Sequence, residues 1–153
     1  PHRIWIAAGR ISQEVTKASV VNWMLMGVFL TRQKLYKYKK INSPICIYCD
    51  SDEKVVEDLY HFLLVCATFN EIRAPFLRKL MAGNECIAKY DTNHKIMTIS
   101  ILDPESGFLP DEITSNWKNV EETYDISRDF VFNMFKKRKT LTEKMEEQEC
   151  DKL

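Results

Sequence analysis

The sequence predicts a mainly α-helical fold: a small irregular domain built around a cluster of three cysteines and one histidine, with a C-terminal amphipathic helix. Three observations predict it. Hydrophobic residues make up 45% of the 153 residues, which is enough to form a core. Apolar residues recur at helical spacing in several segments. The cysteines and the histidine of the cluster fall close together, between Cys46 and Cys66.

The first predicted helix covers residues 14–30 and is expected to be buried, because its apolar positions cover more than one face. These positions are Val15, Ala18, Val21, Met24, Leu25, Val28 and Phe29. The hydroxyl of Thr31 is predicted to cap a new helical turn, with Leu35 facing inward. A stretch rich in lysine and tyrosine follows, and Asn42-Ser43-Pro44 predicts a loop before the first cysteine.

A second helix is predicted over residues 54–64, ending before Cys66. Its apolar positions are Val55, Val56, Leu59, Phe62 and Leu63, and acidic residues near its start suit the positive end of the helix dipole. A third helix is expected over residues 69–81, with Gly83 at its end. Any strand is expected to be short and to lie near the turn between Cys46 and Cys49.

The C-terminal part contains one strong helical pattern. Residues 127–147 place apolar side chains on one side and carry a basic KKRK patch, so we predict an amphipathic helix there. Residues 95–102 fit either a short helix or a strand. We divide the chain into an N-terminal helical segment with a basic stretch (1–40), the cysteine–histidine region with its following helix (41–82) and a helical or loop extension (83–153).

Charge is unevenly distributed along the chain, although the formal net charge is zero. Residues 1–45 contain eight Lys/Arg and one acidic residue, a balance of +7, so residues 46–153 carry −7. This asymmetry favours a basic surface that binds a polyanion. The alternative is a soluble protein that simply has one basic face.

Cysteine content and hydropathy indicate in which cellular compartment the protein is expected. Five cysteines, an odd number without a secretory segment, favour a reducing environment over a disulfide framework. We therefore expect an intracellular protein, nuclear or cytoplasmic. The apolar run at 20–30 is shorter than the roughly 20 residues that span a bilayer, and no membrane partner is expected.

Four residues have the spacing of a metal site. Cys46, Cys49, His61 and Cys66 form a C-x2-C-x11-H-x4-C pattern, and Zn²⁺ prefers thiolates and imidazoles in a tetrahedral site. Four protein ligands leave no position for water, so a bound zinc is expected to be structural. Its ligand atoms should lie about 3–4 Å apart. His61 and Cys66 are about 140° apart around an ideal α-helix, so the helix is expected to end between them.

Two other interpretations of the cysteines remain open. A redox Cys-x2-Cys pair needs a strand before it and a helix that begins at it, whereas a loop with Pro44 precedes this pair. The thiols can also be small buried hydrophobic groups beside an ordinary helical histidine. The sequence contains no phosphate-binding loop and no nucleophile elbow. We expect no catalytic residue and no enzyme activity in this segment by itself.

The stretch FLTRQKLYKYKKINSPICIYC, followed by HFLLVC, resembles the C-terminal zinc-knuckle region of non-LTR (LINE-type) retrotransposon reverse transcriptases. The matching positions are Leu30-Thr31, Leu35, Ser43-Pro44, Cys46, Cys49, His61 and Cys66. That family commonly has Gly after the second cysteine, Pro after the last one and Gly in the basic stretch, where this chain has Asp50, Ala67 and Lys39-Lys40.

The resemblance implies a longer parent protein. That parent would be an RNA-directed DNA polymerase with an endonuclease, and its polymerase domains would lie upstream of this segment and be its partners. Because the sequence starts at Pro1, we interpret it as a fragment or a processed piece. Three origins stay open: the tail of such a protein, a decayed copy, or a host gene that kept the module.

We therefore expect a zinc-stabilised nucleic-acid-binding module that takes RNA or DNA. The predicted phosphate contacts are Arg32, Lys34, Lys37, Lys39 and Lys40, and the predicted base-stacking residues are Tyr36, Tyr38 and Tyr48. Half-burial in the core is the alternative for the tyrosines. A protein-interaction module with no nucleic-acid role is the second hypothesis, with the acidic segment 53–58 or the C-terminal helix as its contact surface.

Overall fold

The fold is given by a computed structural model that describes residues 2–9, 11–50 and 52–152. Helices dominate these ranges and no strand occurs within them; Ile45 and Val56 form one isolated antiparallel bridge. The predicted mainly α-helical fold is therefore confirmed. The helices are α1 (Arg3–Ala8), α2 (Ser12–Leu25), α3 (Arg32–Lys37), the π-helix η1 (His61–Val65), the 3₁₀ turn η2 (Ala67–Phe69), α4 (Asn70–Gly83), the 3₁₀ helix η3 (Glu85–Tyr90), α5 (His94–Leu102), α6 (Asp111–Thr114) and α7 (Val120–Cys150).

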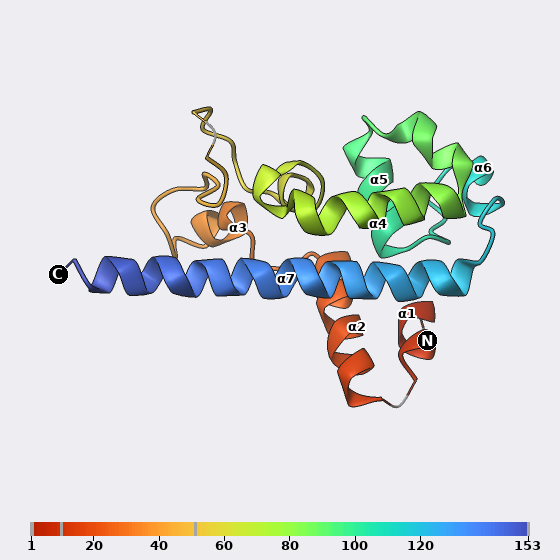
Figure 1. The fold of residues 1–153 in the computed structure, drawn as a ribbon, viewed down its shortest axis with the longest axis horizontal. Helices are drawn as coiled ribbons and strands as arrows, with labels where there is room; N and C mark the ends of the chain where they lie inside the picture. The colour runs from red at the N-terminus through yellow and green to blue at the C-terminus, as the bar shows by residue number, and fades with distance from the viewer. Residues whose placement is uncertain (1, 10, 51, 153) are drawn as a thin grey trace.

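Helix α7 runs the length of the molecule, and the other helices lie on two sides of it (Figure 1). In this view α1 and α2 lie on one side of α7, and α3 to α6 lie on the other. The ring of Phe130 in α7 stacks on Phe76 of α4 with 4.0 Å between centroids. The predicted C-terminal helix is present. It begins earlier than predicted, at Val120, because the Asn119 side chain caps it by accepting a hydrogen bond from the Glu122 N–H.

Helix α2 is shorter than the helix predicted over residues 14–30. It ends at Leu25, and Gly27 then adopts φ = +68°, a left-handed conformation that turns the chain toward α3. The buried positions of α2 are Ala18, Val20, Val21 and Met24. Leu25 and Val28, which the apolar pattern assigns to the core, are instead 38% and 52% exposed.

Helix α3 has a defined cap at each end. The Thr31 hydroxyl accepts from the Lys34 N–H at 3.3 Å, as predicted. At the other end the N–H of Lys40 donates to the Leu35 carbonyl and the N–H of Lys39 to the Tyr36 carbonyl, both at 2.9 Å. This pair of bonds is a Schellman motif, and Lys39 occupies its left-handed position with φ = +56°.

The helix predicted over residues 54–64 is wrong in its first half, where the chain is not helical up to Asp58. The main chain there hydrogen-bonds to the segment around the first cysteine instead. The Cys46 N–H donates to the Val55 carbonyl at 2.8 Å, and the Glu57 N–H donates to the Pro44 carbonyl at 3.0 Å. Helical structure begins only at Leu59 and continues as η1. As predicted, it ends before Cys66.

Helices α4 and α5 complete the side of the molecule that carries the cysteines. Helix α4 matches the prediction over 69–81 and includes the predicted terminal Gly83. Residues 95–102 are helical, as part of α5, because the Asn93 side chain caps that helix by accepting from the Ile96 N–H. Within the described ranges we find no helix with both the length and the apolar character needed to cross a bilayer.

The division of the chain at residues 40 and 82 stays a prediction. Helix α7 packs against α2, α4 and α5, so elements from all three predicted segments meet on this one helix.

Candidate metal centre

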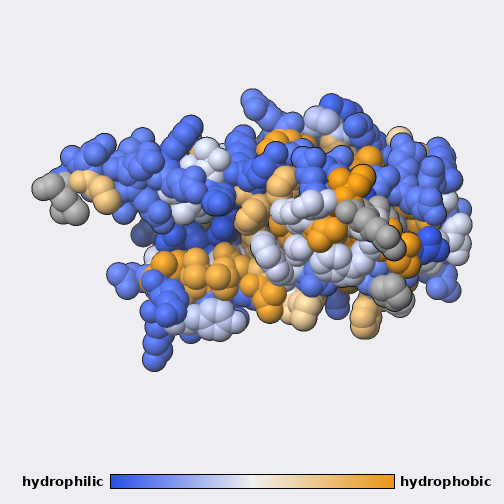
Figure 2. Space-filling view, turned by 90° about the horizontal axis from the view of Figure 1, so that it is seen from below, coloured by the Kyte–Doolittle hydropathy of each residue, from blue (hydrophilic) through white to orange (hydrophobic). Residues whose placement is uncertain are grey.

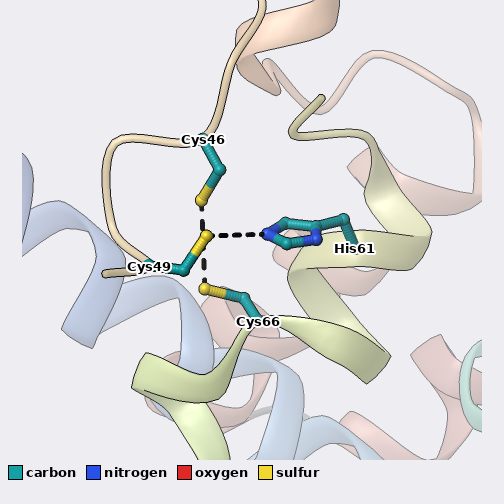
Figure 3. Close-up of side chains that lie close together, drawn as sticks. All are labelled: Cys46, Cys49, His61 and Cys66. Atoms are coloured by element: carbon teal, nitrogen blue, oxygen red, sulfur yellow. Dashed lines mark hydrogen bonds between the residues drawn. The ribbon is translucent and has the colours of Figure 1, made fainter. Parts of the chain in front are cut away.

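The side chains of Cys46, Cys49, His61 and Cys66 converge (Figure 3), and their ligand atoms all lie within 4.8 Å of one another. The Sγ atoms of Cys46 and Cys66 are 3.9 Å apart, and Cys49 Sγ lies 3.6 Å from His61 Nε2. A tetrahedral ion with Zn–S bonds of about 2.3 Å separates its sulfur ligands by about 3.8 Å. The four predicted ligands therefore form a cluster that is compatible with zinc.

The loop that carries Cys46 and Cys49 has neither helix nor strand geometry, and side-chain hydrogen bonds hold it in place. The guanidinium of Arg32 donates to the Ile45 carbonyl at 2.7 Å and to the Ser43 carbonyl at 3.2 Å. Because Arg32 is the first residue of α3, these two bonds join that helix directly to the cysteine loop.

The π-helix η1 brings His61 and Cys66 to the same side. Residues five apart diverge by about 140° on an α-helix, whereas the wider turn of a π-helix, closed by i→i+5 hydrogen bonds, brings them nearer to the same side. The Cys66 N–H donates to the His61 carbonyl at 2.8 Å, which is such a bond. Cys66 then leaves helical geometry with φ = −55° and ψ = 119°. The predicted helix end between the two ligands is correct, and the π turn supplies the rest of the rotation.

Hydrogen bonds to the sulfur atoms of Cys46 and Cys66 shift the pKa of each thiol. The pKa of Cys46 rises to about 12, chiefly because its thiol hydrogen-bonds to Cys66 and also because it is buried. The pKa of Cys66 falls, because its sulfur is stabilised by that same hydrogen bond. Main-chain N–H groups of Tyr48 and Cys49 lower the pKa of Cys46, and that of Thr68 lowers the pKa of Cys66. These amides favour thiolates, the form that binds a metal ion.

Arg73 is a buried cation next to the cluster. It is 3% exposed, and it donates to the carbonyls of Leu63, Phe62 and Cys66 at 2.7, 3.2 and 2.9 Å. These carbonyls lie at the end of η1, where a cation is favoured. Burial lowers the pKa of Arg73, and the charge of Cys66 opposes that effect. Three thiolates and one imidazole around a divalent ion carry a formal charge of −1, which Arg73 is placed to balance.

A buried ion pair between Glu57 and Arg138 connects the segment that carries the predicted metal ligands to α7. Arg138 donates from Nε to Glu57 Oε1 at 2.7 Å and from Nη2 to Oε2 at 3.0 Å. Glu57 Oε2 also accepts from the Arg32 main-chain N–H at 2.8 Å. The Arg138 guanidinium lies 5.5, 5.4 and 5.7 Å from the ring centroids of Phe29, Tyr48 and Phe62.

This ion pair is absent from the sequence-based prediction. Sequence spacing assigns Glu57 to the exposed acidic start of a helix, but Glu57 is 0% exposed and lies outside any helix. The signal in the sequence is the KKRK patch, since one basic residue in an amphipathic helix can face a buried carboxylate. Nothing local indicates which basic residue and which acid form the pair.

The residues that were predicted to contact nucleic acid differ in how exposed they are in the structure. Tyr48 is 6% exposed and its hydroxyl shares a hydrogen bond with Thr142, so the prediction that its ring stacks on a base is wrong. Arg32 is committed to main-chain carbonyls of the cysteine loop, so we assign it a structural role in place of the predicted phosphate contact. Lys34 is partly buried, whereas Tyr36, Lys37, Tyr38, Lys39 and Lys40 are exposed.

Cys86 and Cys150 lie outside the cluster. No protein-family model, curated protein or solved structure matches this chain.

Proposed function

We propose that this chain is a zinc-stabilised nucleic-acid-binding module, the C-terminal part of a protein of the non-LTR retrotransposon reverse-transcriptase type. The observation that carries the proposal is the connection between the cysteine loop and α3. Arg32 donates to Ser43 and Ile45 of that loop, and its main-chain N–H donates to Glu57. Metal binding that orders the loop therefore also fixes α3 and the charges at its end.

Zinc is the cation that we assign to the cluster. Three thiolates and one imidazole are a common ligand set of structural zinc, and they complete a tetrahedron without a water position. Cys46, His61 and Cys66 are buried, which keeps solvent away from the ion. The role that follows for the ion is structural.

The end of α3 supplies the positive charge. Lys37, Lys39 and Lys40 are exposed, and none of them forms an ion pair with any residue that the structure describes. Lys34 lies one turn earlier on the same helix. Unpaired lysines of this kind bind phosphates by replacing condensed counterions.

The backbone at Lys39 supports the resemblance to the reverse-transcriptase family. Its φ of +56° is a left-handed conformation that favours glycine. Proteins of that family commonly have Gly in this stretch, so this chain keeps the turn and places a lysine on it. The resemblance also brings the expectation of upstream polymerase and endonuclease domains and of an intracellular location.

A salt series with the zinc-loaded chain tests the proposal. If Lys34, Lys37, Lys39 and Lys40 each contact a phosphate, log Kobs against log salt has a slope of about −3.6 for duplex DNA and about −2.8 for a single strand. The double variant Lys37→Ala/Lys39→Ala makes the duplex slope shallower by about 1.8, to about −1.8. The matched control, Arg78→Ala/Lys79→Ala, removes two exposed cations from α4 and leaves the slope unchanged. No binding at low salt would refute the proposal.

A protein-interaction module is the second candidate, and an exposed apolar surface favours it. Trp23, Leu25, Met26, Val28 and Leu30, around the end of α2, are 38–67% exposed. Figure 2 shows apolar side chains gathered on the face of the molecule that is seen from below. The two surfaces predicted for this role are less suitable, because Glu57 of segment 53–58 is buried and the apolar face of α7 lies in the core. If the double lysine variant binds nucleic acid like the parent at every salt concentration, this candidate takes precedence.

A further inference from the structure

We infer that the bound nucleic acid is single-stranded, and that one face of α3 together with a hollow beside Tyr60 takes its unpaired bases. This inference rests on the proposed function and names the class of nucleic acid that the same surface recognises.

The hollow lies between the loop that follows α2, helix α3 and the start of η1, and its volume is about 390 Å³. That volume falls within the usual range for sites of small organic groups. Met24, Phe29 and Leu59 give it apolar walls, and Lys34, Asp58 and Tyr60 lie at its polar side. Tyr60 is 39% exposed, so one part of its ring is open to a ligand.

The charges around the hollow favour a base inside it and a phosphate outside. Asp58 would repel a phosphate that entered, and one of its oxygens already accepts from the His61 N–H. An uncharged aromatic base avoids this repulsion, gains apolar contact and can stack on Tyr60. Lys34, on α3 at the same hollow, is placed for the phosphate of that nucleotide.

Helix α3 continues this surface away from the hollow. Lys34, Lys37 and Tyr38 are at positions i, i+3 and i+4, so they share one face of the helix. Tyr38 is 58% exposed, and its hydroxyl has no hydrogen-bond partner in the described part of the chain. A strand along this face places phosphates near Lys34 and Lys37 and a second base on Tyr38. Tyr36, two positions before Tyr38, points to a different face.

A duplex cannot use these two rings, because its bases are already paired and stacked inside the helix. Unpaired bases expose their faces, and stacking on a tyrosine is the sequence-tolerant contact of single-strand-binding proteins. The lysines bind either form through phosphates. The tyrosines therefore supply the preference for single strands.

The test measures fluorescence anisotropy of the zinc-loaded chain with a labelled 12-nucleotide DNA of mixed sequence, the matching RNA and the matching DNA duplex, all at one low salt concentration. Tyr38→Ala and Tyr60→Ala should each weaken single-strand affinity roughly 5- to 150-fold. Tyr38→Phe and Tyr60→Phe, which keep the ring, should bind like the parent. The matched control Phe108→Ala removes a ring that is 86% exposed between α5 and α6, outside this surface. It should also bind single strands like the parent, and duplex affinity should be the same for all five variants.

Zinc content is measured for every variant, because Tyr60 directly precedes His61, one of the four predicted zinc ligands. If Tyr60→Ala loses zinc, Tyr38→Ala decides the outcome, since Tyr38 lies outside the segments that carry the predicted zinc ligands. Tight binding that is insensitive to Tyr38→Ala, or equal parental affinity for single strand and duplex, would overturn this inference and leave the proposed function standing. Failure of the parent to bind any of the three probes would overturn both. A difference between the DNA and RNA strands identifies which of the two is preferred.

Discussion

The main-chain N–H of Cys66 donates to the carbonyl of His61 at 2.8 Å, and this bond sets the relative position of two of the four ligands. It closes one π turn, which brings an imidazole and a thiol five residues apart to the same side of the chain. π turns are often found at functional sites. In this chain the turn accounts for the H-x4-C spacing.

Replacing His61 tests whether the cluster binds metal through a fourth ligand. His61→Ala should lower zinc affinity more than about a hundredfold, since the loss of a mere supporting residue already costs 10- to 100-fold. His61→Cys should retain one zinc per chain, because four thiolates are also a common structural set. Competition with a chromogenic chelator measures both affinities. An affinity of His61→Ala within tenfold of the parent would show that the imidazole is not a ligand.

Removing the metal should loosen the C-terminal half of α7 before its N-terminal half. Lys137 donates to the Thr68 carbonyl, and the Thr142 hydroxyl shares a hydrogen bond with the Tyr48 hydroxyl. This half of α7 is therefore hydrogen-bonded to residues that lie next to the predicted metal ligands. The N-terminal half packs on α4 through Phe130 and Phe76. Hydrogen exchange after chelation should rise over residues 136–150 and stay low over 123–134. Uniform exchange along α7 would contradict this coupling.

The Glu57–Arg138 pair should be costly to break on one side. Arg138→Met leaves the buried carboxylate of Glu57 without its partner, so the free energy of unfolding in excess zinc should fall by about 3–5 kcal/mol. The double variant Glu57→Met/Arg138→Met should recover part of this loss, because apolar groups can replace a buried pair. Recovery should be incomplete, since the Arg32 N–H loses its acceptor. Urea unfolding of the parent, Glu57→Met, Arg138→Met and the double variant measures the effect. Additive losses in the double variant would mean that the two residues do not stabilise each other.

Lys39→Gly separates stability from binding. Glycine relieves the left-handed strain of about 1–2 kcal/mol, and the greater freedom of the unfolded chain takes back about 0.4–1 kcal/mol. A net gain of up to about 1.5 kcal/mol is expected in urea unfolding. The same change removes one phosphate contact, so the duplex salt slope should become shallower by about 0.9. Lys39→Val, which is disfavoured at positive φ, should instead destabilise. Stabilisation by valine would refute the assignment of the turn.

The parts of the site that the sequence predicts are those defined by neighbours along the chain. The four ligands, the Thr31 cap and the C-terminal amphipathic helix all follow from local spacing. Glu57 was beyond such reasoning, because its partner Arg138 is 81 residues away and only the folded chain brings them together.

The same limit explains the late start of the helix before His61. Residues 54–58 have helical apolar spacing, but Val55 and Glu57 hydrogen-bond to the main chain at Cys46 and Pro44. The contacts with the cysteine loop therefore override local periodicity. Tyr48 is similar, since a tyrosine between two cysteines shows in sequence neither that it is buried nor that it contacts α7.

The most direct test of the central claim is the zinc content of the purified chain, measured by native mass spectrometry alongside elemental analysis. The structure predicts one zinc per chain in the parent and in the Cys86→Ser control, whose cysteine lies outside the cluster. It predicts little or no zinc in Cys49→Ser, with loss of folded structure around the ligands. A folded parent without zinc that does not take it up when it is supplied, or a Cys49→Ser chain that binds zinc as tightly as the parent, would contradict the claim that these four residues form a structural metal site.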